Sequence, residues 1–221
     1  TSTSLLLGLG IPPAIASASV HVAEVFTTGA SGISHFRFGN VNKKLFLGLL
    51  VPGIIGAVTG AFLLSKVING DIIKPFMSAY LLILGIIVLR KAFQHKKGKS
   101  KTKRLGLLAL FGGFMDAIGG GGWGPVVTST LLSKGRSAHY TIGSVNAAEF
   151  FISLSSAGTF LLFGAITGWP VIIGLIIGGV IASPFAALLV RKIKRKPLMI
   201  MVGILIILTS LRTIIMALMH H

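Results

Sequence analysis

Long apolar runs, separated by short clusters of Lys and Arg, constrain this 221-residue chain more than any other feature. A helix needs about 20 predominantly apolar residues to cross a hydrocarbon core of about 30 Å. Several runs of that length are present, and the mean hydropathy is +0.90. Only 11% of the residues are charged, whereas soluble domains average about 25%. We therefore predict an all-α, polytopic membrane protein.

Six apolar runs are predicted to cross the membrane as single helices. Their ranges are 14–36, 45–64, 72–89, 138–163, 170–190 and 197–218. Two further runs, 105–118 and 125–132, flank a glycine-rich segment and are too short to span singly at a rise of about 1.5 Å per residue. Residues 1–10 resemble the second of these half-helices. We predict that 105–132 is a re-entrant hairpin that dips into the membrane and returns.

The distribution of basic residues supports this hairpin. The chain has 21 Lys and Arg against four Asp and Glu, a net charge of +17. With the hairpin, 18 of the 21 basic residues lie on one side of the membrane, whereas a single crossing there would divide them 12 to 9. Basic loops favour the cytoplasmic side. The loops predicted to be cytoplasmic are 37–44, 90–104, 133–137 and 191–196.

Several function classes are excluded or disfavoured by composition. A soluble protein this basic would suggest nucleic-acid binding, but these bases lie between apolar runs, so no nucleic-acid partner is expected. The chain has no cysteine, which excludes disulfides, cysteine-ligated metal centres and thiol nucleophiles. No ATP-binding motif and no converging Ser, His and Asp set is found. We expect no enzyme activity and no cofactor.

An internal repeat appears when the chain is shifted by 125 residues. The clearest matches are Ser19-Val20 with Ser144-Val145, Ala23-Glu24 with Ala148-Glu149, Phe26 with Phe151, and Gly53 with Gly178. We predict a first repeat over 1–93, a basic cytoplasmic linker over 94–104 and a second repeat over 105–221. Three crossings in each repeat, an odd number, invert one repeat relative to the other, as in many secondary transporters. By this alignment the first repeat's own glycine loop is expected before Thr1.

Glu24 and Glu149 lie at equivalent repeat positions, each close to the middle of a predicted crossing. Intramembrane charge costs several kcal/mol, so such residues usually face a cavity and take part in transport. We interpret them as proton-binding or pathway residues. The alternative is a structural pair of protonated carboxyls that hydrogen-bond between helices.

Polar residues accompany each glutamate. Ser19 and His21 precede Glu24, and Ser144 and Asn146 occupy the equivalent positions before Glu149. We predict that these four residues hydrogen-bond an anion or relay protons. His21-x-x-Glu24 has the spacing of two metal ligands on a helix. Because no third ligand is near in sequence and Asn146 replaces the histidine in the other repeat, no metal is expected.

The glycine-rich segment is the third candidate feature. Asp116-Ala117-Ile118 precedes Gly119-Gly120-Gly121-Gly122, and Trp123-Gly124-Pro125 follows. Glycines allow a close backbone approach to a ligand, and Pro125 suits the start of a new half-helix, whose positive end would favour an anion. A flexible break for close helix packing is the alternative. Asp116 is expected to cap the break or pair with a cation, and Trp123 to anchor at the interface or cover the ligand.

Small-residue spacings provide candidate packing surfaces. Gly56-x-x-x-Gly60 and Gly174-x-x-x-Gly178 are typical of helix-packing faces. We expect packing within the chain, with a homodimer interface as the alternative.

The residues from Gly112 to Pro125, together with Ser144-Val145 and Glu149 downstream, resemble the TauE/SafE family of sulfite exporters, also described as toluene-sulfonate uptake permeases. The stretches Gly10–Asn42 and Pro52–Ala61 are similar to the family's repeat as well. The resemblance implies a bacterial inner-membrane permease for sulfur-containing anions such as sulfite, sulfoacetate or other sulfonates. Members differ in substrate and in direction of transport.

Together these features predict a secondary transporter that works by alternating access in the lipid bilayer. The anion is expected near Gly120, Gly121, Gly122 and Trp123, with hydrogen bonds from Ser19, His21, Ser144 and Asn146. The residues expected to bind the coupling proton or gate the path are Glu24, Glu149 and Asp116. A channel-like anion facilitator without coupling is the alternative function.

Overall fold

Long helices account for most of the computed structural model, which describes residues 2–68, 70–93, 104–134, 136–192 and 195–219. These are α2 (Pro13–Arg37), α3 (Lys43–Lys66), α4 (Gly70–Phe93), α7 (Ala138–Leu162), α8 (Trp169–Lys192) and α9 (Arg195–Met219). Each has 24 or 25 residues, which corresponds to about 36 Å of helix. The described residues contain no strand. The all-α prediction is therefore confirmed, and the six helices agree with the six predicted crossings to within a few residues.

Hydropathy distinguishes these helices from one another. Lys43–Lys66 and His139–Leu162 are each long and apolar enough to cross a membrane by length and composition alone. Shorter apolar stretches occur over Leu105–Gly119, Trp169–Ala182 and Met199–Arg212. Helix α2 is interrupted by polar residues, several of which are buried. Helix α2 is the most polar of the long helices, and it packs against α7 and α8.

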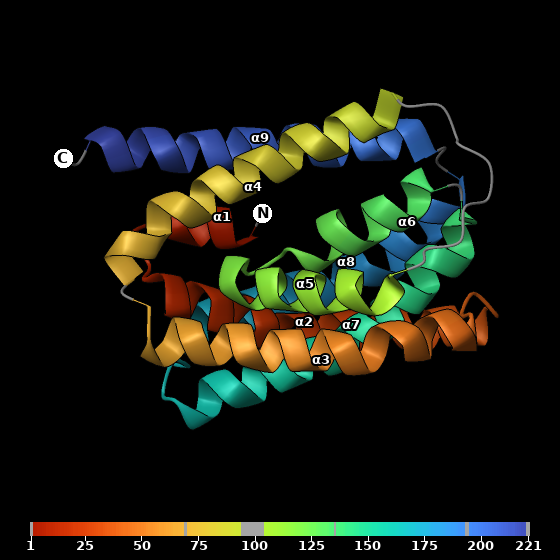
Figure 1. The fold of residues 1–221 in the computed structure, drawn as a ribbon, viewed down its shortest axis with the longest axis horizontal. Helices are drawn as coiled ribbons and strands as arrows, with labels where there is room; N and C mark the ends of the chain where they lie inside the picture. The colour runs from red at the N-terminus through yellow and green to blue at the C-terminus, as the bar shows by residue number, and fades with distance from the viewer. Residues whose placement is uncertain (1, 69, 94–103, 135, 193–194, 220–221) are drawn as a thin grey trace.

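Four short elements break the pattern of long helices. Helix α1 (Ser2–Gly8) precedes α2, and α5 (Leu105–Gly119) is followed by a π-helical turn, η1 (Gly124–Thr128), and by α6 (Ser129–Ser133). In Figure 1, α5 runs towards the left of the view and α6 returns to the right. We call residues 105–133 the glycine hairpin, because its turn is made of glycines. The break lies where the sequence pattern places it.

The helix ends that flank the four basic loops gather at one end of the bundle. Figure 1 shows the ends of α2, α4, α6 and α8, and the beginnings of α3, α5, α7 and α9, at the right of the view. This arrangement follows from the hairpin, because a single crossing by 105–132 would place α7 and later helices the other way round. Residues 94–103 of the predicted linker, with 135 and 193–194 of the predicted loops, lie outside the described residues.

The hairpin is held by close contact between α3 and α5. A Cβ added at Gly56 would overlap the Leu110 carbonyl oxygen, and one added at Gly113 would overlap the Gly53 carbonyl oxygen. A Cβ added at Gly60 would also overlap the Phe114 carbonyl oxygen. The Gly56 and Gly60 face therefore packs within the chain, as predicted. The second spacing behaves differently, because a Cβ at Gly174 or Gly178 would meet no described atom within 4 Å.

Replacing Gly113 with Ala should destabilise the protein. The new methyl group cannot fit without separating two backbones, and overpacking of this kind costs about 1–3 kcal/mol. Gly174→Ala is the matched control in α8, where the methyl enters open space and is expected to be neutral or slightly stabilising. Thermal unfolding of both purified variants in detergent measures the difference. Equal unfolding midpoints would contradict the close α3–α5 contact.

Candidate functional site

Glu24 and Glu149 lie at the same level along the helix bundle. Glu24 is the twelfth residue of α2 and Glu149 the twelfth of α7, and these two helices pack against each other. The two carboxyl groups interact electrostatically. The Ser153 hydroxyl of α7 donates a hydrogen bond of 3.2 Å to Glu24 Oε2. The packing of α2 on α7 thus brings the repeated acids into one polar region.

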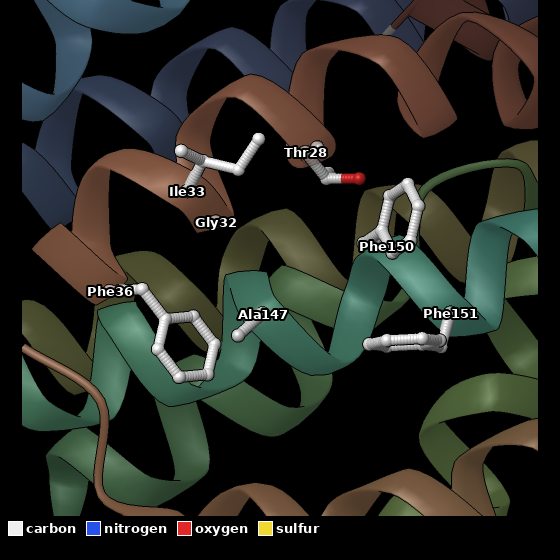
Figure 2. A pocket seen from close by; sticks show the side chains of 8 residues that line it. Thr28, Gly32, Ile33, Phe36, Ala147, Phe150 and Phe151 are labelled. Carbon is white, nitrogen blue, oxygen red and sulfur yellow. The ribbon is translucent and has the colours of Figure 1, made fainter.

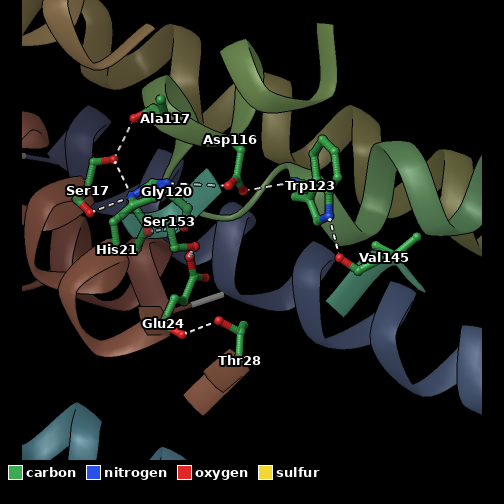
Figure 3. A network of polar contacts seen from close by, with 11 residues as sticks. Ser17, His21, Glu24, Thr28, Asp116, Ala117, Gly120, Trp123, Val145 and Ser153 are labelled. Atoms are coloured by element: carbon green, nitrogen blue, oxygen red, sulfur yellow. Dashed lines mark hydrogen bonds and ion pairs between the residues drawn. The ribbon is translucent and has the colours of Figure 1, made fainter. Parts of the chain in front are cut away.

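A histidine and an aspartate from different helices meet beside Glu24. His21 Nε2 of α2 lies 3.3 Å from Asp116 Oδ2 at the end of α5, and both side chains are fully buried. Figure 3 shows these residues converging with Ser17 and Ser153 at the turn of the glycine hairpin. The sequence pattern singled out both residues without indicating that they pair, since they are 95 positions apart.

The orientation of the His21 ring is fixed by α2 itself. His21 Nδ1 lies 2.8 Å from the Ser17 carbonyl oxygen, which can only accept a hydrogen bond. Nδ1 therefore carries a hydrogen. The Ser17 hydroxyl donates to the Ala117 carbonyl oxygen of α5 at 2.5 Å, which adds a second link between α2 and the glycine hairpin.

Asp116 also closes the turn of the glycine hairpin. Its Oδ1 accepts a hydrogen bond of 2.8 Å from the Trp123 amide, and its carbonyl oxygen accepts one of 2.6 Å from the Gly120 amide. Gly120 and Gly121 have φ values of +57° and +141°, a region that favours glycine. Asp116 therefore caps the break and faces His21 at the same time.

His21, Glu24 and Asp116 form a compact set of cation-binding groups. Their donor atoms all lie within 4.8 Å of one another, a spacing that suits one shared cation, whether a proton or a metal ion. Asp116 supplies the third group that the sequence around His21-x-x-Glu24 lacked. An imidazole and two carboxylates favour a positive charge at this place, so direct binding of an anion requires that some of these groups carry protons.

Three other predicted site residues contact different parts of the bundle. Ser144 accepts a hydrogen bond of 2.9 Å from the Asn42 amide and donates one of 2.7 Å to the Tyr140 carbonyl oxygen. Asn146 donates to the Ser31 hydroxyl at 3.0 Å. Ser19 is buried beside Gly168. These contacts thus lie outside the His21, Glu24 and Asp116 cluster.

Trp123 lies in the hydrophobic core. Its side chain has no exposed surface and packs with Val127 and Ile152. Its indole Nε1 donates a hydrogen bond of 3.2 Å to the Val145 carbonyl oxygen of α7. The ring is therefore not an anchor at the membrane interface. It fixes the glycine hairpin to α7.

An apolar pocket lies between α2 and α7, one helical turn from the glutamates. Its volume is about 240 Å³, and Figure 2 shows phenylalanine rings along its walls. The lining residues are Thr28, Gly29, Gly32, Ile33, Phe36, Ala147, Phe150 and Phe151. The Thr28 hydroxyl already donates to the Glu24 carbonyl oxygen. The polar groups available to an ion are therefore in the cluster and not in this pocket.

Sequence reasoning missed Ser17 and Ser153. A retrospective signal exists for each: Ser17 lies one turn before His21, and Ser153 lies one turn after Glu149, just as Thr28 follows Glu24. Ser and Thr hydroxyls in helices often hydrogen-bond to nearby backbone groups of the same helix. The contact between Ser153 and Glu24, however, depends on how α7 packs on α2.

Comparison with known proteins gives a family match over nearly the whole chain. The profile of the family described as "Sulfite exporter TauE/SafE" matches residues 1–213. The chain is 47% identical to the "Probable membrane transporter protein YtnM" of Bacillus subtilis (strain 168), over 97% of this chain and 75% of that protein. It is 28% identical to the "Probable membrane transporter protein ORF9" of Sinorhizobium sp, over 90% of this chain and 78% of that protein. No solved structure matches.

The burial of Trp123 predicts a large difference between the two tryptophans. Trp123→Ala should lower the free energy of unfolding by about 3–5 kcal/mol, because it leaves a large cavity in the core. Trp169 is 55% exposed, so Trp169→Ala should change it by no more than about 0.5 kcal/mol. Thermal unfolding in detergent tests both. A similar loss in the two variants would show that Trp123 is not a core residue.

Proposed function

The chain belongs to the TauE/SafE sulfite exporter family and is a membrane transporter, and from this premise we propose a substrate and a mechanism. It is a secondary transporter that moves a small sulfur-containing anion, such as sulfite, sulfoacetate or another organosulfonate, by alternating access. Transport is linked to protons. The observation that carries the proposal is the cluster of His21, Glu24 and Asp116, in which the His21 and Asp116 side chains have no exposed surface, with Glu149 close enough to interact electrostatically.

The chemistry of the cluster couples anion binding to proton binding. Ionised carboxylates repel an anion and offer no hydrogen-bond donor, whereas a protonated carboxyl has lost its charge and donates one hydrogen bond. The anion therefore binds best when Glu24, Glu149 or Asp116 holds a proton. Thermodynamic linkage makes the effect reciprocal, because an anion that binds the protonated form also favours proton uptake.

The glycine hairpin supplies a place for the anion within this proposal. The Trp123 amide is bonded to the Asp116 carboxyl group. A protonated carboxyl is a weaker acceptor than a carboxylate, because charge-assisted hydrogen bonds are about twice as strong. An oxyanion would then take the place of the Asp116 carboxyl group as the hydrogen-bond acceptor at the segment Gly120–Trp123. Ser19, Ser144 and Asn146 would line the path along α2 and α7 rather than the central site.

Helix packing supports the proposed division into repeats. A shift of 125 residues makes α2, α3 and α4 equivalent to α7, α8 and α9. Helix α2 packs on α7, and α4 on α9, so equivalent helices meet. Packing of α3 on α7 corresponds to packing of α2 on α8. Rocking of one inverted repeat against the other would expose the central cluster to each side in turn.

The proposed location is the bacterial inner membrane, with several crossings. The four basic loops would face the cytoplasm, following the preference of Lys and Arg for that side. The gathering of their flanking helix ends at one end of the bundle supports this orientation.

Ligand-dependent stability tests the proposed substrate. A bound anion stabilises the folded state by mass action, by about 2.7 kcal/mol at a concentration 100 times its Kd. We expect sulfite or an organosulfonate to raise the unfolding temperature in detergent more than sulfate or acetate does. Sulfoacetate, taurine and thiosulfate extend the series. Equal stabilisation by all anions, or by none, would contradict the assignment of a sulfur-containing substrate.

Neutral replacements of the glutamates test proton linkage. Glu24→Gln and Glu149→Gln keep the shape of the side chain but cannot release a proton. We expect both to abolish accumulation of sulfite driven by a pH gradient in proteoliposomes, while the purified proteins stay folded. Asp71→Asn, which changes an acid at the start of α4, is the matched control. Normal accumulation in both glutamine variants would contradict the proposal, and flux independent of the gradient would indicate an uncoupled facilitator.

A further inference from the structure

We propose that His21 and Asp116 form a binding site for a single proton, and that this proton joins α2 to the glycine hairpin. The inference rests on the proposed function for its role in transport, since it names where the coupling proton is held. The binding itself is argued from the geometry of the pair. The sequence predicted that His21 hydrogen-bonds the anion or relays protons, and the proposal assigns it a role in proton binding.

The first step is the state of the His21 ring. Nδ1 carries a hydrogen because it lies 2.8 Å from the Ser17 carbonyl oxygen. The Ser17 hydroxyl cannot change this assignment, since its own hydrogen is donated to Ala117. In a neutral imidazole with a hydrogen on Nδ1, Nε2 has a lone pair and no hydrogen. The hydrogen-bond network thus leaves Nε2 as the nitrogen that gains or loses a proton.

The second step is the contact between Nε2 and Asp116. Nε2 faces Oδ2 at 3.3 Å, and neither atom has a hydrogen-bond partner elsewhere in the described part of the chain. Without a proton, two lone pairs would face each other in a site with no exposed surface. With one proton, the pair is either imidazolium and carboxylate or imidazole and carboxylic acid. Both forms are attractive and have no net charge, so one proton is the favoured occupancy.

The surrounding ionisable groups favour retention of that proton. Glu24 of α2 lies within the same cluster, and Glu149 of α7 interacts electrostatically with Asp116. Tyr80 of α4 also interacts electrostatically with Asp116. Ionised Glu24 and Glu149 attract a positive charge at His21. Binding of protons by these glutamates would therefore ease release of the proton from the pair.

Loss of the proton acts on the glycine hairpin through Asp116. The same carboxyl group binds the Trp123 amide, and Trp123 binds α7 through Val145. When the proton leaves, His21 no longer attracts Asp116, and the remaining negative charge of Asp116 faces Glu24. Contact between α2 and the glycine hairpin is weakened. Raising the pH is therefore expected to loosen the contact between α2 and the glycine hairpin.

The two repeats differ at this site. The position equivalent to His21 is Asn146, whose amide group donates to Ser31 and does not titrate. The single-proton site is thus built around the histidine of the first repeat. His21→Asn copies the second repeat and is the natural test variant.

Trp123 provides the readout. In a Trp169→Phe background it is the only tryptophan. Its side chain is buried and its backbone amide donates a hydrogen bond to Asp116, so its fluorescence is sensitive to opening of the hairpin. As the pH rises from mildly acidic to mildly alkaline, we expect emission to move to longer wavelength. Glu24 and Glu149 are left intact in this titration.

The double variant His21→Asn with Asp116→Asn, in the same background, keeps two groups that can hydrogen-bond but has no proton to release. We expect the emission shift to be lost. If this variant aggregates on size exclusion, the single His21→Asn variant decides the question by the same measurement. His139→Gln, at an exposed histidine beside Ser137, is the matched control and should keep the shift.

Two outcomes would overturn the proposal. One is an emission titration in the double variant that matches its Trp169→Phe parent. The other is a stoichiometric amount of bound metal in the purified parent protein and no bound metal in the double variant. A metal ion and not a proton would then hold His21 and Asp116 together. Exchange of labelled sulfite at equal pH in proteoliposomes distinguishes a failure of the proton-site proposal from a failure of the proposed transport function. Failure of exchange with sulfite and organosulfonates counts against the transport proposal, while the emission titration still decides the proton site.

Discussion

The Asp116 carboxyl group makes the interaction on which the rest of the site depends. One oxygen accepts the Trp123 amide and so closes the turn of the glycine hairpin. The other faces His21 of α2. A buried carboxyl is costly unless it is paired and hydrogen-bonded, so these two contacts must form together. The position of the glycine hairpin relative to α2 is thereby tied to the charge state of one buried pair.

This pairing requires that α5 approach its neighbours closely. Gly56, Gly60 and Gly113 allow the backbones of α3 and α5 to touch, and Trp123 fills the space between the hairpin and α7. Small residues are the usual means of such close approach in membranes, where apolar side chains gain little by leaving lipid. The side chains of His21 and Asp116 have no exposed surface, and charge in a buried site is costly unless it is paired.

Much of the fold follows from local sequence patterns. The lengths of the apolar runs predicted the six long helices, because the bilayer sets the length of a crossing helix. The glycines of 119–122 followed by Pro125 predicted the break between α5 and η1. The sequence also singled out Glu24 and Glu149, since acids are rare in crossings and these two lie at equivalent positions of the predicted repeat. Of the two roles predicted for Trp123, an anchor at the membrane interface was wrong, because its ring is fully buried among core residues. The other role, a cover over the ligand, stays a prediction.

The sequence by itself determined the membrane-protein class, the helical segments and the break in the hairpin, because each of these depends on residues close together in the chain. Tertiary structure decided which of those residues meet. His21 and Asp116 are 95 positions apart, and only the return of α5 against α2 pairs them. Ser153 reaches Glu24 only because α7 packs on α2. Contacts between distant segments depend on the packing angle and register of whole helices, and no local pattern encodes them.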